Sequence, residues 1–176
     1  MKIDLKRYIR NVKDFPKEGI MFRDITTLLK EPAALKLAFN ELYKLAKDLN
    51  ISKVVGIESR GFIFGSMLAE KLNAGFIPIR KPGKLPAEKE SKTYDLEYGS
   101  DTIEIHKDAI KIDERILLHD DLLATGGTAL AAANLIESLG GEVVQISFVV
   151  ELSFLNGREK LKKYNVKSLV NYDSEE

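Results

Sequence analysis

Cysteine is absent from this chain of 176 residues, so the protein can form neither disulfide bonds nor thiolate metal sites. That absence fits a reducing compartment. Long apolar runs are absent too, since no window approaches the roughly 18 apolar residues of a membrane span. The N-terminal stretch 1–15 carries charges every few residues and lacks the apolar core of a signal peptide. We therefore expect a cytoplasmic protein with no membrane contact.

An excess of charge of one sign is also missing, because 27 basic residues balance 27 acidic residues. A protein without an overall positive field does not hold nucleic acid non-specifically, so we expect no nucleic-acid partner. Hydrophobic residues make up 44% of the chain and charged residues 31%, which is typical of a globular protein. No repeat, low-complexity tract or linker divides the sequence, and we expect a single domain over residues 1–176.

Short apolar runs alternate with segments of helical spacing along most of the chain. The expected strands are 53–58, 75–80, 94–99, 102–106, 115–121, 142–152 and 167–172. The expected helices are a short leading helix through Leu5, Tyr8, Ile9 and Val12, a helix from Pro32 to about Leu49, a helix at 61–72 and a helix from about Gly127 to Leu139. This alternation predicts an α/β fold with a mainly parallel central sheet flanked by helices. Ligands of such sheets bind beyond the carboxyl ends of the strands.

The segment 81–101 does not fit this compact pattern, because it is long and charged and contains two prolines and two glycines. A loop of this length inside a compact domain is usually a functional lid or a disordered excursion.

The most specific motif is ILLHDDLLATGGTALAAANLIESLGG at 116–141, where an apolar strand leads into two acids, a glycine loop and an apolar helix. Five residues at the start of that helix are suited to a phosphate: Ala124, Thr125, Gly126, Gly127 and Thr128. Glycines let backbone N–H groups converge on one anion, and the helix N-terminus adds partial positive charge. The loop is neither a Walker A motif nor a dinucleotide fingerprint. Asp120 and Asp121 can accept hydrogen bonds from the two hydroxyls of a ribose.

This segment resembles the 5-phosphoribosyl-1-diphosphate motif of the type I phosphoribosyltransferases, in the form DDLLATGGT that is typical of their adenine-specific branch. The family usually has an aliphatic residue where this chain has His119. The resemblance extends from Val12 to about Tyr172. It implies transfer of the phosphoribosyl group from that diphosphate to adenine, giving AMP and pyrophosphate in purine salvage. It also implies a homodimer with Arg80 near the subunit interface.

Three further segments are similar to parts of the same family. FPKEGIMFRDIT at 15–26 resembles its base-binding segment, which implies that backbone groups of Met21 and Arg23 bind the edge of adenine while Phe22 packs on the ring. GIESRGFIFG at 56–65 resembles its pyrophosphate loop, formed here by Glu58, Ser59 and Arg60, with a cis bond between the first two.

The third segment, 81–101, resembles the family's flexible hood loop. The resemblance implies that Lys81 and Lys84 approach the pyrophosphate and that Glu97 and Tyr98 close over the purine. Glu97 is then the candidate general base for the proton of adenine, and Asp120 and Asp121 stabilise a cationic ribose. The sequence contains no dedicated metal cage, so we expect Mg²⁺ to be carried by the phosphates of the substrate.

Two alternatives stay open. A phosphoribosyltransferase for a 6-oxopurine, such as hypoxanthine or xanthine, would differ mainly in the backbone groups of residues 20–23. A non-catalytic regulator that senses the diphosphate and binds DNA would carry an added N-terminal helix-turn-helix domain. The enzyme-like segment begins by Val12 and the net charge is zero, and both observations favour the enzyme.

Overall fold

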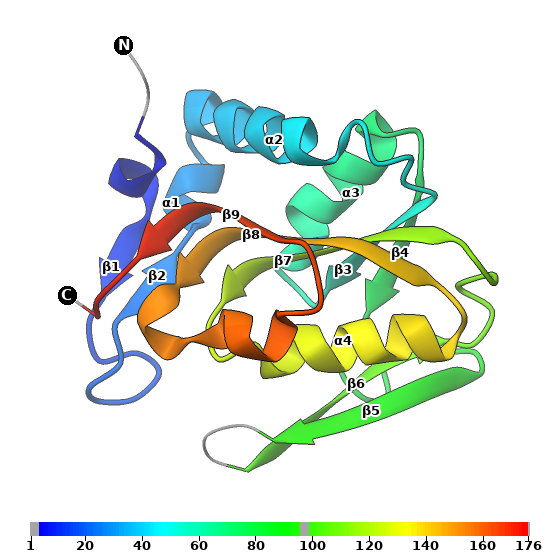
Figure 1. Cartoon of the computed structure of the whole chain (residues 1–176). Coiled ribbons are helices and arrows are strands. Elements are labelled where there is room, and N and C mark those ends of the chain that lie inside the picture. The colour runs from blue at the N-terminus through cyan, green and yellow to red at the C-terminus, as the bar shows by residue number, and fades with distance from the viewer. Residues whose placement is uncertain (1–3, 96–98, 176) are drawn as a thin grey trace.

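The computed structural model describes residues 4–95 and 99–175, and its centre is a sheet of five parallel strands in the order β4-β3-β7-β8-β9 (Figure 1). The strands are β3 Lys53–Ile57, β4 Gly75–Ile79, β7 Arg115–Leu123, β8 Glu142–Leu152 and β9 Val166–Tyr172. Their continuous apolar runs are buried on both faces, as a parallel sheet covered by helices requires. The predicted α/β fold is confirmed.

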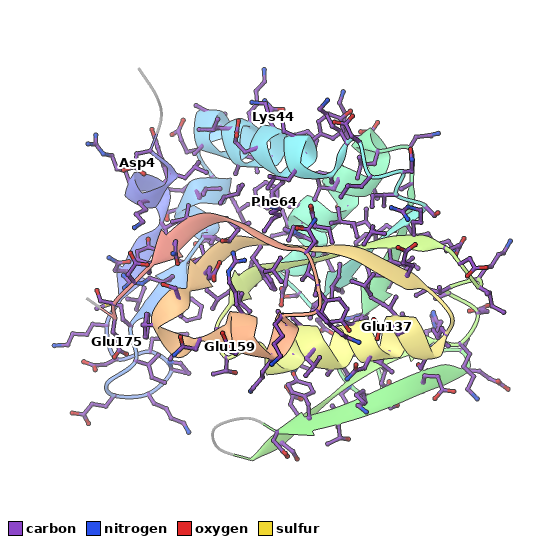
Figure 2. All side chains as sticks on the ribbon, viewed as in Figure 1. Asp4, Lys44, Phe64, Glu137, Glu159 and Glu175 are labelled. Atoms are coloured by element: carbon purple, nitrogen blue, oxygen red, sulfur yellow. The ribbon has the colours of Figure 1, made fainter. Side chains whose placement is uncertain are left out.

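Helices cover both faces of this sheet (Figure 1). α2 Pro32–Ala46 and α3 Gly61–Lys71 lie on one face, and α4 Gly127–Ser138 lies on the other. Each face has its own apolar cluster: Leu42 and Phe64 are buried on the α2 and α3 side, and Leu118 and Ile136 are buried on the α4 side. Figure 2 shows Phe64 in the interior, with Lys44 and Glu137 on the outer surfaces of their helices. The sheet is therefore packed between two layers of helix.

Shorter elements extend this core at its edges. The structure adds the 3₁₀ helices η1 Leu5–Tyr8, η2 Ser153–Leu155 and η3 Gly157–Leu161, the helix α1 Thr26–Leu29, and the antiparallel pair β1 Arg10–Val12 and β2 Phe22–Asp24. None of the helices in the described part of the chain is long and apolar enough to cross a membrane.

The leading helix is shorter than predicted. The helical spacing suggested a helix through Val12, but the helical turn ends at Tyr8 and the chain continues as β1. Arg10 pairs with Asp24 in the strand ladder, and its guanidinium Nε donates to the Asp24 carboxylate at 3.0 Å. This tertiary pairing outweighs the local helix propensity.

The expected hairpin is present, but its first strand was misplaced. The structure has β5 Lys89–Asp95 paired antiparallel with β6 Ser100–His106, so much of the segment expected as a loop is strand. Only β6 has an apolar face: Ile103 and Ile105 are buried, whereas β5 is mostly exposed. A strand without an apolar face shows no alternation of apolar and polar residues, because it is held by backbone pairing and by polar side-chain contacts such as that between Thr93 and Thr102.

Candidate active site

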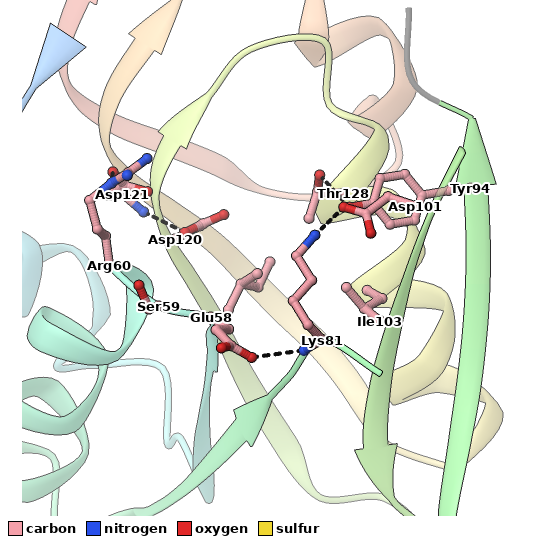
Figure 3. Close-up of a pocket in the computed structure, with 11 residues that line it drawn as sticks. Glu58, Ser59, Arg60, Lys81, Tyr94, Asp101, Ile103, Asp120, Asp121 and Thr128 are labelled. Carbon is pink, nitrogen blue, oxygen red and sulfur yellow. Dashed lines mark hydrogen bonds and ion pairs between the residues drawn. The ribbon is translucent and has the colours of Figure 1, made fainter. Parts of the chain in front are cut away.

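A cavity of about 410 Å³ opens beyond the carboxyl ends of β3 and β7 (Figure 3). It is lined by Ile57, Glu58, Ser59, Arg60, Lys81, Tyr94, Asp101, Ile103, Asp120, Asp121 and Thr128. The structure thus brings together seven residues that the sequence singled out, from three separate segments. This location agrees with the rule for ligands of parallel sheets.

The turn Glu58–Ser59–Arg60 leads from β3 into α3, and its first peptide bond is cis, as the family resemblance implied. The Glu58 carboxylate accepts hydrogen bonds from the Lys81 backbone N–H at 2.8 Å and from Arg80 Nε at 3.1 Å. The Arg80 hydrogen bond and the Lys81 N–H lower the pKa of Glu58, which keeps this carboxylate ionised. Glu58 therefore fixes the chain that follows β4 against the turn that follows β3.

The α3 helix begins close to the end of β7 because Gly61 has no side chain. A Cβ at Gly61 would lie 2.9 Å from the His119 carbonyl oxygen and 3.0 Å from Asp120 Oδ1. Glycine at this position is required for the close approach of Arg60 to the acid pair.

Asp120 and Asp121 are held in different ways. The Asp121 carboxylate is buried and accepts a hydrogen bond from Arg60 Nε, whereas Asp120 is only partly buried and points into the cavity (Figure 3). Burial and the neighbouring charge of Asp121 raise the pKa of Asp120 well above its usual value. Burial alone would lower the pKa of Arg60, but the Asp121 and Asp120 carboxylates raise it. The two carboxylates thus share the single positive charge of Arg60, and that charge does not fully compensate Asp120.

The glycine loop forms a second hollow of about 210 Å³ beside the first, lined by residues 122–129 together with Arg60, Asp120 and Asp121. Gly126 has a φ of +79°, a left-handed conformation that favours glycine. Its ideal Cβ would lie 2.5 Å from the carbonyl oxygen of Gly157, which precludes a side chain. α4 begins at the next residue, so the N-terminus of a 12-residue helix faces this hollow. The geometry suits an anion.

Besides Ile57 at the end of β3, three cavity residues were missed in the sequence: Tyr94, Asp101 and Ile103. Lys81 Nζ pairs with the Asp101 carboxylate, and Thr128 Oγ1 donates to the Tyr94 hydroxyl at 3.1 Å. All three belong to the β5–β6 hairpin, which lies beside α4 (Figure 1). Tyr94 and Asp101 fall within the stretch set apart by its length and charge, but no motif distinguishes them from their neighbours.

The N-terminal segment contributes one residue next to the cavity. The Phe22 ring lies 5.3 Å from the guanidinium of Arg60 and packs edge-on against Phe15 at 5.2 Å between ring centres. The Arg23 side chain is buried elsewhere, over the ring of Tyr172 at 4.1 Å. Met21, Phe22 and Arg23 do not line the cavity, so an adenine role for this segment stays a prediction that rests on Phe22 and the β2 backbone.

Two other predicted residues lie apart from the cavity lining. Lys84 is exposed and does not line the cavity. Glu97, with Tyr98, lies outside the described residues. His119, the departure from the family pattern, is fully buried, and its Nδ1 lies 2.9 Å from Ser147 Oγ. Burial lowers the pKa of His119 to about 3, so it adds no titration near neutral pH.

Similarity to known proteins assigns the chain to a class. The family model for the phosphoribosyl transferase domain matches residues 24–175. The chain therefore belongs to the phosphoribosyl transferase domain family, in agreement with the acid pair and phosphate loop at one strand end.

Its similar relatives share one activity. The adenine phosphoribosyltransferase of Christiangramia forsetii is 60% identical over 170 residues, covering 97% of this chain and 99% of that protein. The solved adenine phosphoribosyltransferase of Thermoanaerobacter pseudethanolicus is 50% identical, with a TM-score of 0.93 and coverage of 96% and 98%. That of Giardia lamblia, complexed with 9-deazaadenine, is 41% identical, with a TM-score of 0.92 and coverage of 97% of each chain. Within the family, the chain is thus similar over nearly its whole length to adenine phosphoribosyltransferases.

Proposed function

We propose that the protein transfers the 5-phosphoribosyl group from 5-phosphoribosyl-1-diphosphate to adenine, releasing AMP and pyrophosphate. The observation that carries this proposal is the placement of Asp120 and Asp121 between the glycine loop and the Glu58–Arg60 turn. Two anion-ready sites flank one acid pair, which is the arrangement that a ribose with a phosphate at each end requires. The relatives at 60% and 50% identity supply adenine as the acceptor.

The glycine loop is the proposed site of the 5′-phosphate. Residues 124–128 line the smaller hollow, and their backbone N–H groups and the hydroxyls of Thr125 and Thr128 are the donors we propose for the phosphate. The Asp120 carboxylate points into the cavity, where it can accept hydrogen bonds from the ribose hydroxyls. When the anomeric bond breaks, the sugar gains positive charge, and the acid pair stabilises it electrostatically. Burial and the Asp121 charge raise the pKa of Asp120, and a positive charge that develops on the ribose beside the pair favours its ionised form.

The pyrophosphate end of the proposed site lies at the Glu58–Ser59–Arg60 turn and Lys81. Arg60 and Lys81 supply positive charge, and Ser59 lines the same wall of the cavity. Glu58 acts by holding the Lys81 backbone. The Lys84 side chain is exposed and does not line the cavity. Its contact with the pyrophosphate therefore stays a proposal that rests on the family resemblance.

We also propose Mg²⁺ as the cofactor, bound together with the donor. Among the described residues no three His, Asp or Glu side chains are grouped to hold a metal ion by themselves. The crowded carboxylates of Asp120 and Asp121 nevertheless fit a divalent cation whose remaining ligands are phosphate oxygens and water. Such a cation would neutralise charge on the leaving pyrophosphate.

The direct test is the formation of AMP from adenine, with the donor and Mg²⁺, measured beside guanine, hypoxanthine and xanthine. We expect adenine to be used with by far the highest kcat/KM. Equal efficiency with hypoxanthine would instead support the 6-oxopurine alternative. If no nucleotide product forms with any of the four bases, the proposal is contradicted.

Glu97 is the proposed proton acceptor for adenine, as the family resemblance implies. A general base contributes about 10²–10⁴-fold to turnover, so Glu97→Gln is expected to lower kcat by that order while adenine still binds. Single-turnover rates measure the chemical step directly. If the chemical step slows by less than about threefold, well below this range, solvent rather than Glu97 is the proton acceptor.

The remaining proposals concern the whole molecule. We propose a homodimer, one domain over residues 1–176 with base-binding elements at 15–26 and 81–101, and a cytoplasmic location. Light scattering of the purified protein tests the dimer, and a single cooperative unfolding transition would support the single domain.

A further inference from the structure

Lys81 and Asp101 form an ion pair in the lining of the main cavity. Lys81 follows β4, whereas Asp101 lies on β6, and their side chains meet inside the lining of the cavity (Figure 3). The side chains are 44% and 28% exposed, so the pair is accessible from the cavity that it lines. Asp101 is further held by the Thr102 backbone N–H at 2.8 Å.

The same carboxylate continues into a hydrogen-bonded chain. The Tyr94 hydroxyl donates to Asp101 Oδ2 at 3.3 Å, and Thr128 Oγ1 donates to the Tyr94 oxygen at 3.1 Å. Asp101 thus accepts directly from Lys81 and, through Tyr94, orders the hydroxyl of Thr128. This chain, Lys81–Asp101–Tyr94–Thr128, links the residue that follows β4 to the phosphate loop at the start of α4 (Figure 3).

The two ends of that chain are groups that the proposed function gives to the donor. Lys81 belongs to the pyrophosphate end and Thr128 to the 5′-phosphate end. In the structure, the ammonium already has an anionic partner and the hydroxyl already has an acceptor. An incoming diphosphate must take over the ammonium, and it also meets the negative charge of Asp101 beside Glu58, Asp120 and Asp121.

We propose that Asp101 is a positioning residue that competes with the pyrophosphate group for Lys81 and thereby sets the affinity of the site for that group. The proposal rests on the proposed function. Between turnovers, Asp101 keeps Lys81 neutralised within the cavity. During turnover, the same carboxylate favours release of pyrophosphate, because it restores a partner to Lys81 when the product leaves.

The test measures the dissociation constants of Mg²⁺-pyrophosphate and of ribose 5-phosphate separately, by calorimetry. Asp101→Asn removes the competing charge, so pyrophosphate is expected to bind about three- to fivefold more tightly, the range of a partly exposed ion pair. Asp101→Glu keeps the charge and is expected to stay within about twofold of the parent. Asp101→Ser is a second neutral variant, in case the asparagine variant does not fold.

Tyr94→Phe separates the two ends of the chain. It frees the Thr128 hydroxyl but leaves the Lys81–Asp101 pair in place. Ribose 5-phosphate is therefore expected to bind more tightly to this variant, with the affinity for pyrophosphate unchanged. Asp108→Asn is the control for net charge, because Asp108 is exposed and lies outside the cavity lining.

A kinetic measurement extends the binding test. If pyrophosphate release limits turnover, Asp101→Asn lowers kcat while kcat/KM for the donor rises, a split that a merely structural role would not produce. Unchanged or weaker pyrophosphate binding in folded Asp101→Asn would overturn the inference. A parent protein that forms no AMP and binds neither ligand would instead overturn the proposed function, and the inference with it.

Discussion

Charged residues lie at both ends of strands β3 and β7, but they are paired at the amino ends and incompletely paired at the carboxyl ends. At the amino ends, Lys53 Nζ donates to the Ala109 carbonyl at 2.7 Å and pairs with Glu114 at 2.9 Å. The Glu114 carboxylate also accepts from the Lys111 backbone N–H at 2.8 Å. At the carboxyl ends, Asp120 faces Asp121 with one guanidinium, that of Arg60, bound to only one of them.

This difference separates charges that stabilise the fold from charges that are available to a ligand. Partial burial alone would raise the pKa of Glu114, but the Lys111 N–H and the Lys53 ammonium lower it, so the folded state favours its ionised form. Asp120 has the opposite shift, so the folded state opposes its ionisation. Perturbation in that direction, inside a cavity, is characteristic of functional groups.

The largest expected effect comes from neutralising Asp120. Asp120→Asn keeps the shape but removes the charge that stabilises a cationic ribose, so turnover is expected to fall about 10²–10³-fold, as for other single electrostatic groups. The free energy of unfolding at neutral pH is expected to stay equal or to rise. The folded pKa of Asp120 is raised, so its ionisation costs stability as the pH rises from the unfolded pKa through the folded pKa.

Steady-state rates and urea unfolding of the same Asp120→Asn preparation check both halves of this prediction. A large loss of stability would show that the Asp120 charge stabilises the fold, as the Glu114 charge does. Full activity would remove it from the site.

The second prediction uses two glycines with positive φ that lie at opposite ends of α4, Gly126 at +79° and Gly140 at +92°. An alanine at either position costs roughly 1–2 kcal/mol of stability from the left-handed backbone. Only Gly126→Ala also drives a methyl group from the phosphate loop against a backbone carbonyl that packs behind it, that of Gly157. Ribose 5-phosphate binding is expected to weaken about tenfold or more, the loss of one charge-assisted hydrogen bond.

Gly140→Ala is the matched control for this experiment, because its Cβ meets the Ile112 side chain, far from the proposed anion site. Thermal unfolding is expected to shift in both variants, and calorimetry with ribose 5-phosphate to change in Gly126→Ala alone. Weaker binding in both variants would mean that general destabilisation, not the shape of the loop, controls the site.

The smallest expected effect is at the amino end. Glu114→Gln is expected to lower the free energy of unfolding by about 1 kcal/mol at neutral pH and to leave kcat/KM unchanged. Because the folded pKa of Glu114 is lowered, its stabilisation is present above the unfolded pKa and is lost as the pH falls through the folded pKa.

Urea unfolding of parent and Glu114→Gln between pH 7 and pH 3 measures this dependence, and the two stabilities are expected to converge in acid. A constant difference over that range would assign the effect to packing. A fall in kcat/KM would contradict the distinction between the two ends.

The sequence was informative where local pattern and long-range structure agree. The strand at 142–152 was predicted with its observed bounds, and the Asp120 to Thr128 motif could be read directly, because continuous apolar runs and glycine loops have few other structures. The β5 strand was misplaced because its residues have no buried face, and β1 was missed because it depends on pairing with β2. Asp101 could not be found from the sequence, because only its ion pair with Lys81, 20 positions away, distinguishes it from other acidic residues.

The contact between Gly126 and Gly157 has a consequence for anyone who recombines this chain with a relative. A Cβ on Gly157 would lie 2.2 Å from the Ala124 carbonyl oxygen, and one on Gly126 would lie 2.5 Å from that of Gly157. The backbone after β8 is therefore the rear support of the phosphate loop, although 31 positions separate the two glycines in the numbering. In a chimera, residues 120–128 and 152–158 have to come from the same parent. A crossover between them would pack the phosphate loop of one protein against a backbone segment of another that is not complementary to it.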